Sequence, residues 1–288
     1  MISTGGHLTI LESVDSTNNY AMAMVRTGMA KHGDGYFAMA QLQGKGQRGK
    51  TWITEPRTNI ILTLAIQVSP LQLSQQFQFS AAVALGVYDF FAHYAGDETT
   101  IKWPNDIYWR DRKAGGILIE SIVGSQLGAD SRESIVNSRK TDDNHEFSSN
   151  KSGEAKGLPT SDSRLATNSW LWAIAGMGIN INQTLFPENI RNAVSLKQIT
   201  GKNWDVIELA KELSKHVLQR YEQLLAGKNL LTEYNNHLFK KGQTVKFKKD
   251  SRVFEGIVKE VNTRGELVVM TAIEECFGFG EIEWILSS

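Results

Sequence analysis

Two neighbouring motifs constrain this chain more than any other feature. The run Lys102-Trp103-Pro104-Asn105-Asp106 is followed six residues later by Arg112–Glu120, which contains a lysine and two glycines. The first run begins as a strand that must end at Pro104, and Gly116–Val123 is typical of a buried strand that lets a ligand approach its backbone. An acid and a base held at strand ends suit a phosphate, a metal ion or an anionic substrate. A hairpin with a surface ion pair is the alternative, and the spacing does not separate the two.

A glycine-rich basic loop lies upstream, at Gln41–Trp52, after the apolar strand predicted over Gly35–Leu42. Three glycines alternate in it with three basic residues. Such a loop can fold its amides and cations around a phosphate or a carboxylate. It has neither the Gly-Lys-Ser/Thr ending of a P-loop nor the helix-opening glycine of a dinucleotide fingerprint. A flexible, solvated turn is the alternative interpretation.

Composition limits the class of protein. The chain has 288 residues, 41% of them hydrophobic, which suggests one sizeable globular domain and a small one. Basic and acidic residues are equal at 31 each, so no overall basic field favours nucleic acid. The single cysteine, Cys276, excludes an internal disulfide and fits a reducing compartment. No signal pattern or membrane-length apolar run is visible, and we expect a cytoplasmic protein that does not bind membranes.

Hydrophobic periodicity predicts an alternation of strands and helices. Helices are predicted after the capping residues Ser16, Ser74 and Asp205. The predicted strands of the first 181 residues lie at 7–12, 35–42, 60–68, 101–103, 116–123 and 170–181. The last two would form a hairpin but for residues 124–169, whose polar, aperiodic composition predicts a surface insertion. After a short helix predicted over 231–239, period-two alternation indicates a small β-domain.

Five segments, in this order, resemble the biotin protein ligase family. They are Asp15-Ser16-Thr17-Asn18, the Gln41–Trp52 loop, Lys102–Asp106, Arg112–Glu120 and Gly176–Asn182, with a weaker sixth match over Gly242–Leu286. The resemblance covers nearly the whole chain except the insertion. It implies an α/β (α+β) fold with a mixed, largely antiparallel sheet backed by helices. It also implies a catalytic domain at 1–240 and a small SH3-like β-barrel at 241–288.

The resemblance implies a reaction in two steps. The biotin carboxylate attacks the α-phosphate of ATP, with Mg²⁺, and a lysine of a biotin carboxyl carrier domain then attacks the biotinyl-5′-AMP formed. Such chemistry needs cations at the carboxylate and phosphates, and a closed site that protects the anhydride from water. No DNA partner is expected, and the protein is expected to be a monomer or a homodimer.

The site residues are assigned by matching the family's motifs. Catalytic roles are implied for Lys113, Asp106 and Arg48. Biotin contacts are implied for Ser16, Thr17, Asn18, Gln41, Lys45, Gly46, Gln47, Lys113 and Gly116. ATP contacts are implied for Lys45, Arg48, Lys102, Trp103, Asn105, Asp106, Lys113 and Asn180, and metal contacts for Asp106 and Asn180.

Three other functions are alternatives to this interpretation. A lipoate ligase or octanoyl transferase shares the core fold, but would carry a different pattern of arginines and glycines and no Lys-Trp-Pro-Asn-Asp run. A biotin-responsive DNA-binding repressor would need an additional amino-terminal domain, for which we expect no room, and a basic surface. A non-catalytic binding module would lack Asp106 or Lys113, and both are present.

Overall fold

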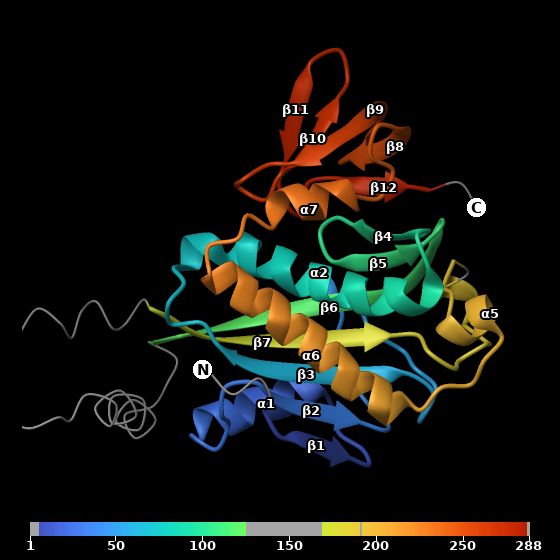
Figure 1. Cartoon of the computed structure of the whole chain (residues 1–288). Coiled ribbons are helices and arrows are strands. Elements are labelled where there is room, and N and C mark those ends of the chain that lie inside the picture. Colours follow the sequence, from blue (N-terminus) through green and yellow to red (C-terminus); the bar gives the residue numbers. More distant parts are fainter. Residues whose placement is uncertain (1–5, 125–168, 191, 287–288) are drawn as a thin grey trace, which may run out of the picture.

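The computed structural model describes residues 6–124, 169–190 and 192–286. Within these residues, the larger of two sheets has seven strands in the order β1-β2-β3-β7-β6-β5-β4 (Figure 1). Its strands are β1 (Leu8–Leu11), β2 (Asp34–Ala38), β3 (Ile60–Gln67), β4 (Thr99–Lys102), β5 (Asp106–Trp109), β6 (Arg112–Val123) and β7 (Trp170–Ile179). Among them, β1 and β2 are parallel and the other neighbours antiparallel. The predicted mixed, largely antiparallel sheet is confirmed.

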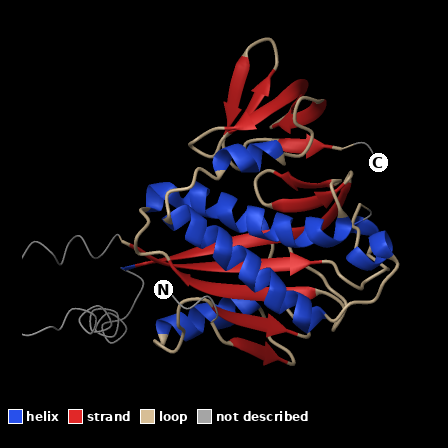
Figure 2. Ribbon diagram, in the orientation of Figure 1, coloured by secondary structure: helices blue, strands red, loops and turns tan. Residues whose placement is uncertain are grey.

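The two central strands, β3 and β7, are buried along almost their whole length because helices cover both faces of the sheet. On one face, α2 (Gln76–Ala95) and α6 (Val206–Leu225) pack side by side (Figure 2). On the other face, α1 (Thr17–Arg26) covers a second apolar cluster. Successive side chains of β3 point to opposite faces of the sheet. Leu62 and Leu64 pack in the main core, and Thr63, which bonds Asn18 of α1, lies on the α1 side.

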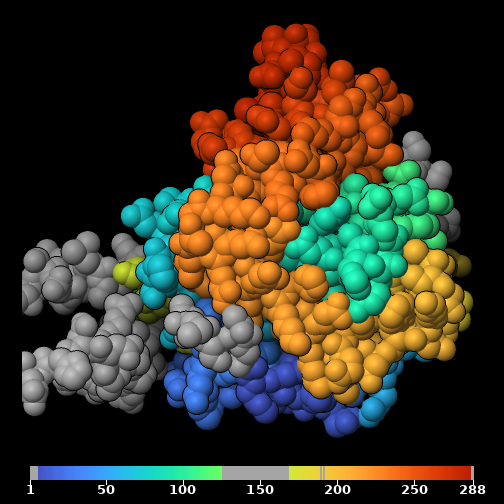
Figure 3. Space-filling view, in the orientation of Figure 1, coloured from blue at the N-terminus to red at the C-terminus, as the bar shows by residue number. Residues whose placement is uncertain are grey.

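The C-terminal strands form a separate antiparallel sheet, consistent with the predicted SH3-like barrel. In the described part of this region, five strands follow the order β11-β10-β9-β8-β12. They are β8 (Thr244–Lys249), β9 (Arg252–Val261), β10 (Leu267–Met270), β11 (Glu274–Phe277) and β12 (Glu283–Ile285). Figure 3 shows them as a projection on one end of the molecule. Trp103 Nε1 donates to Gly265 O at 3.0 Å, which ties this sheet to the β4–β5 turn.

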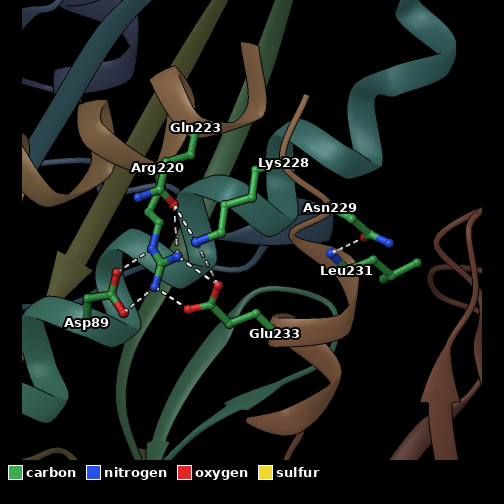
Figure 4. A network of polar contacts seen from close by, with 7 residues as sticks. All are labelled: Asp89, Arg220, Gln223, Lys228, Asn229, Leu231 and Glu233. Atoms are coloured by element: carbon green, nitrogen blue, oxygen red, sulfur yellow. Dashed lines mark hydrogen bonds and ion pairs between the residues drawn. The ribbon is translucent and has the colours of Figure 1, made fainter. Parts of the chain in front are cut away.

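A buried arginine joins three helices at this end of the main domain (Figure 4). Arg220 of α6 forms ion pairs with Asp89 of α2 and Glu233 of α7 (Leu231–Asn236), with N–O distances of 2.5 Å in each. Hydrogen bonds to Asp89 and Glu233 raise the pKa of Arg220, and the bond from Arg220 lowers the pKa of Glu233. The charges are therefore compensated within the fold.

Several boundaries differ from the sequence-based prediction. Ser16 is at the N-cap of α1, but its side chain makes no capping hydrogen bond. The cap predicted at Ser74 is wrong, because a short turn with a Gln72–Gln75 capping box precedes α2. Asp205 is confirmed as a cap, and it accepts from Ile207 N and Glu208 N. The predicted insertion lies almost entirely outside the described residues, and α5 (Leu196–Thr200) was not predicted.

None of the helices in the described ranges combines the length and the apolar character needed to cross a membrane.

Candidate active site

A cavity of about 730 Å³ is lined by residues of the main sheet and of the C-terminal region. Its wall is formed by the start of α1, the glycine loop, the β4–β5 turn, strands β6 and β7, and the segment that leads into β12. The predicted site residues that line it are Ser16, Thr17, Asn18, Gln41, Lys45, Gly46, Gln47, Arg48, Lys102, Trp103, Asn105, Asp106, Lys113 and Gly116. Segments separated by more than a hundred residues are thus brought to one place.

Lys113 and Asp106 form an ion pair inside the cavity. The Nζ–Oδ1 distance is 2.7 Å, and the side chains are 28% and 21% exposed. Strand pairing creates this contact, because Asp106 at the start of β5 lies opposite Gly116 and Lys113 lies opposite Tyr108. A Cβ atom at Gly116 would lie 3.3 Å from Asp106 Oδ1 and 3.5 Å from Lys113 Cε. Glycine at this position therefore leaves space beside the ion pair.

Asn180 is the predicted site residue that does not line this cavity. Its side-chain amide donates to Val194 O at 3.2 Å and to Lys113 O at 3.4 Å, and its backbone N–H donates to Ala114 O. Asn180 is buried, so these bonds satisfy an amide that has left water. The contacts hold the backbone of Lys113 and provide no direct route to a ligand in the cavity.

Lys102 is a second cation on the cavity wall. Its Nζ donates to Tyr108 Oη at 3.2 Å and lies 4.9 Å from the centroid of the same ring. Burial lowers the pKa of Lys102 to about 8, with Asp106 opposing the shift and Lys113 and Lys50 adding to it. This ammonium is therefore poorly solvated and would gain from an anion placed in the cavity.

The opposite part of the cavity is built from neutral polar groups. Gln41 Oε1 accepts from the Thr17 backbone at 2.9 Å and from the Thr17 hydroxyl at 3.2 Å. Thr63 Oγ1, fully buried, donates to Asn18 Oδ1 at 2.7 Å, and Asn18 Nδ2 donates to Glu120 Oε2 at 2.8 Å. These bonds fix the orientation of the Asn18 amide. Thr63 and Glu120 do not line the cavity, and their support of Asn18 was not predicted, although a threonine inside the apolar β3 run was a visible signal.

Ser16 differs from its neighbours because its side chain makes no hydrogen bond to another described residue. It is 2% exposed and lines the cavity. A hydroxyl that lines a cavity can donate to a ligand and accept from it. Ser16 is thus placed to bond a ligand directly, whereas Asn18 is already engaged by protein groups.

Trp52, at the end of the glycine loop, covers the floor of the cavity. A Cβ atom at Gly178 would lie 2.5 Å from Trp52 Cε2, and one at Gly116 would lie 3.4 Å from Trp52 Cζ3. The glycines of β6 and β7 therefore let the indole lie against the sheet. The Trp52 indole N–H is buried and has no hydrogen-bond partner within the described ranges.

The glycine loop is fastened at both sides of the cavity. Lys45 Nζ donates to Asn19 Oδ1 at 2.5 Å, and Arg48 Nη1 donates to Gly280 O at 3.2 Å. Gly280 belongs to the segment before β12, which also contributes Phe279 and Ile282 to the lining, and β12 itself contributes Trp284. These C-terminal residues were not predicted as site residues, because nothing in the sequence places them beside a loop more than two hundred positions away.

The arrangement has a neutral hydrogen-bonding end, a set of cations and the carboxylates of Asp106 and Glu283 in a single cavity. An anionic ligand with a neutral polar head group would satisfy both ends. The described residues contain no group of three or more His, Cys, Asp or Glu that could hold a metal ion. These donors therefore do not suit a metal ion held by protein ligands alone. A Mg²⁺ that keeps waters and phosphate ligands needs only one or two protein carboxylates.

Comparison with known proteins shows a similarity to one family over part of the chain. Residues 10–130 match the model of the Biotin/lipoate A/B protein ligase family. The "Bifunctional ligase/repressor BirA" of Escherichia coli (strain K12) is 32% identical over 118 residues, which are 40% of this chain and 35% of that protein. The "Biotin--[acetyl-CoA-carboxylase] ligase" of Mycobacterium tuberculosis is 32% identical over 116 residues, 39% of this chain and 44% of its relative. The matches thus span less than half the length of these curated relatives.

The fold is shared along nearly the whole chain. The biotin protein ligase from Aquifex aeolicus, solved in complex with biotin and ATP, superposes with a TM-score of 0.69. The superposition covers 98% of this chain and 99% of that one, at 20% sequence identity. The C-terminal sheet is therefore part of the common architecture.

Proposed function

We propose that this chain, a member of the biotin/lipoate A/B protein ligase family over residues 10–130, is a biotin protein ligase. It activates biotin with ATP to biotinyl-5′-AMP and transfers the biotinyl group to a lysine of a biotin carboxyl carrier domain. The observation that carries the proposal is the single cavity with a neutral polar end and a cationic end. Biotin has a neutral ureido ring and a carboxylate, so one molecule can satisfy both.

The neutral end is suited to the ureido ring. The Ser16 hydroxyl is free of protein hydrogen bonds in the described chain, and Thr17 and Gln41 lie beside it on the lining. Gly116 and Gly178 let the Trp52 indole lie against the sheet, where it forms an apolar wall for the ring. The rigid contacts of Asn18 with Thr63 and Glu120 support this end without using up the Ser16 hydroxyl.

The cationic end performs the adenylation. Lys113 stabilises the charge that develops where the biotin carboxylate meets the α-phosphate, because a compact ammonium can follow that charge. Lys102 and Arg48, also on the cavity wall, neutralise the remaining phosphates. A Mg²⁺ carried by ATP would be held by Asp106 and would lower the charge of the triphosphate. Asn180 acts at a distance by fixing the Lys113 backbone.

Transfer to the carrier requires a neutral amine. Asp106 lies within 2.7 Å of Lys113 Nζ, and a carboxylate at that place can accept the proton of an incoming carrier lysine as its nitrogen attacks the anhydride. AMP then leaves, and the acyl–phosphate bond is exchanged for an amide. We propose a biotin carrier domain as the partner because relatives are named for acetyl-CoA carboxylase.

Lipoate is the alternative substrate, since the matching family model includes lipoate ligases. Incubation of the purified protein with ATP, magnesium and either labelled biotin or labelled lipoate separates the two. We expect formation of biotinyl-AMP and release of pyrophosphate in the incubation with biotin, and no adenylation in the incubation with lipoate. Adenylation of lipoate but not of biotin would overturn the proposal.

A further inference from the structure

Lys102 lies at the end of β4, where aromatic rings from both sheets face its ammonium group. Lys102 Nζ is 4.9 Å from the centroid of Tyr108 on β5 and 5.6 Å from that of Trp284 on β12. The ring of Phe239 joins them, with centroids 4.9 Å from Tyr108 and 5.7 Å from Trp284. The ammonium therefore lies against an aromatic wall that is complete only when the C-terminal sheet is packed in place.

This wall holds the cation without cancelling its charge. An aromatic face attracts an ammonium through its quadrupole but carries no net charge, unlike a carboxylate. Within the described residues, the hydrogen bond recorded for Lys102 goes to Tyr108 Oη, and an ammonium has three N–H donors. The nearby carboxylate of Asp106 is engaged with Lys113 at 2.7 Å. Lys102 thus keeps both charge and donors available to an anion in the cavity.

The indole of Trp284 is less favourable for packing alone than an aliphatic or phenyl side chain. Trp284 Nε1 is buried, and no hydrogen-bond partner for it exists among the described residues. An unpaired buried N–H costs free energy that an aliphatic or phenyl side chain would avoid. Trp284 also packs on Phe247 at a centroid distance of 5.0 Å, which a phenyl ring could equally do. What indole adds is the strongest cation–π face.

We propose that Trp284 is a positioning residue that directs the Lys102 ammonium toward the phosphate chain of ATP. Through it, the C-terminal sheet contributes to binding the triphosphate and the pyrophosphate that leaves. This inference rests on the proposed function for the identity of the anion. Inorganic pyrophosphate is the probe, because its binding can be measured without turnover.

The test is a double-mutant cycle on the full chain, with pyrophosphate affinity measured by calorimetry at fixed magnesium. We expect Lys102→Met to weaken binding about tenfold and Trp284→Leu about fivefold, as a partly buried cation–π contact implies. The double variant should bind no more weakly than Lys102→Met, because Trp284 acts only through that lysine. Trp284→Phe should retain most of the affinity.

Phe254→Leu is the matched control, since Phe254 lies on β9 of the same sheet and contacts Phe247 without facing Lys102. It should bind pyrophosphate as the wild type does. Losses that multiply in the double variant, or an equal loss in Phe254→Leu, would overturn the positioning role. If Trp284→Leu does not fold, Trp284→Phe takes its place in the double-mutant cycle. The small loss of pyrophosphate affinity caused by Trp284→Phe must then be absent in the Lys102→Met background. A protein that binds pyrophosphate in this pattern but adenylates no biotin would refute only the proposed function.

Discussion

Lys113 and Asp106 share one place in the cavity, and each changes what the other can do. Their 2.7 Å ion pair lies in a site where both side chains are less than a third exposed, so the attraction is stronger than on the surface. When a carboxylate and a phosphate enter, Lys113 exchanges one anionic partner for another. Asp106 is then available for a metal ion or for a proton. The pair thus serves both proposed steps.

Replacing Lys113 by alanine should reduce adenylate formation by about a hundredfold or more, because the charge that stabilises the reacting phosphate is removed. Release of pyrophosphate in the presence of biotin measures this step. Lys202→Ala, at an exposed lysine outside the cavity, is the control and should behave like the wild type. Wild-type pyrophosphate release by a folded Lys113→Ala protein would exclude the assigned role.

The pKa of Lys102 makes a pH dependence testable. Burial lowers this pKa from 10.5 to about 8, so the free protein loses the ammonium charge as the pH rises through about 8. Because phosphate is attracted by the charged form, kcat/KM for ATP should fall between pH about 7 and about 9. In this range Lys102 binds more protons in the unfolded chain than in the folded one, so its contribution to the stability of the fold rises with pH. Unfolding therefore does not explain the predicted fall in kcat/KM, and the fall should be absent from Lys102→Met.

At the scale of elements, the patterned segments were predicted and the long-range contacts were not. The β6–β7 hairpin followed from two apolar runs, and the Asp205 cap from one acidic residue before a helical period. Gln72, which caps the turn before α2, was missed because glutamine is uncommon as a cap, and serine nearby gave a stronger signal. The hydrogen bond between Thr63 and Asn18 depends on how α1 packs on β3. No local sequence pattern predicts that packing.

The described ends of β6 and β7 make a prediction about the segment between them. Val123 pairs with Trp170, and Gly124 N donates to Ser169 O at 2.9 Å, so the two strands already meet at their ends. A short Gly/Asn turn in place of residues 125–168 should preserve folding and biotin transfer, since a shorter loop costs less closure entropy. Circular dichroism and a transfer assay check both. Loss of carrier biotinylation with intact adenylate synthesis would instead assign the segment a docking role.

The Arg220 network makes a prediction about stability. Arg220 has a side chain only 10% exposed and serves carboxylates on two other helices, so Arg220→Met should lower the free energy of unfolding by about 3 kcal/mol. Lys211→Met breaks an exposed pair with Glu208 and should cost about 0.5 kcal/mol or less. Denaturant unfolding of both variants measures the difference. Equal losses would contradict the structural role given to this network.

At the scale of the whole molecule, the cavity belongs to two sheets that are distant in sequence. The main sheet provides the Lys113–Asp106 pair, while the segment before β12 provides Gly280 and β12 provides Trp284. Sequence motifs located the first set because its residues are clustered in short runs. The second set was hidden because its residues contribute a carbonyl oxygen and an aromatic face, which have no distinctive pattern. The shape of the cavity therefore depends on how the two sheets pack.

The most direct test of the account is mass spectrometry of a purified biotin carrier domain incubated with this protein, biotin, ATP and magnesium. The account predicts one added biotinyl group, located on a single carrier lysine, and none when ATP is omitted or when the Lys113→Ala variant replaces the wild type. A carrier domain that stays unmodified under these conditions, while a known biotin ligase modifies it in parallel, would contradict the proposed function.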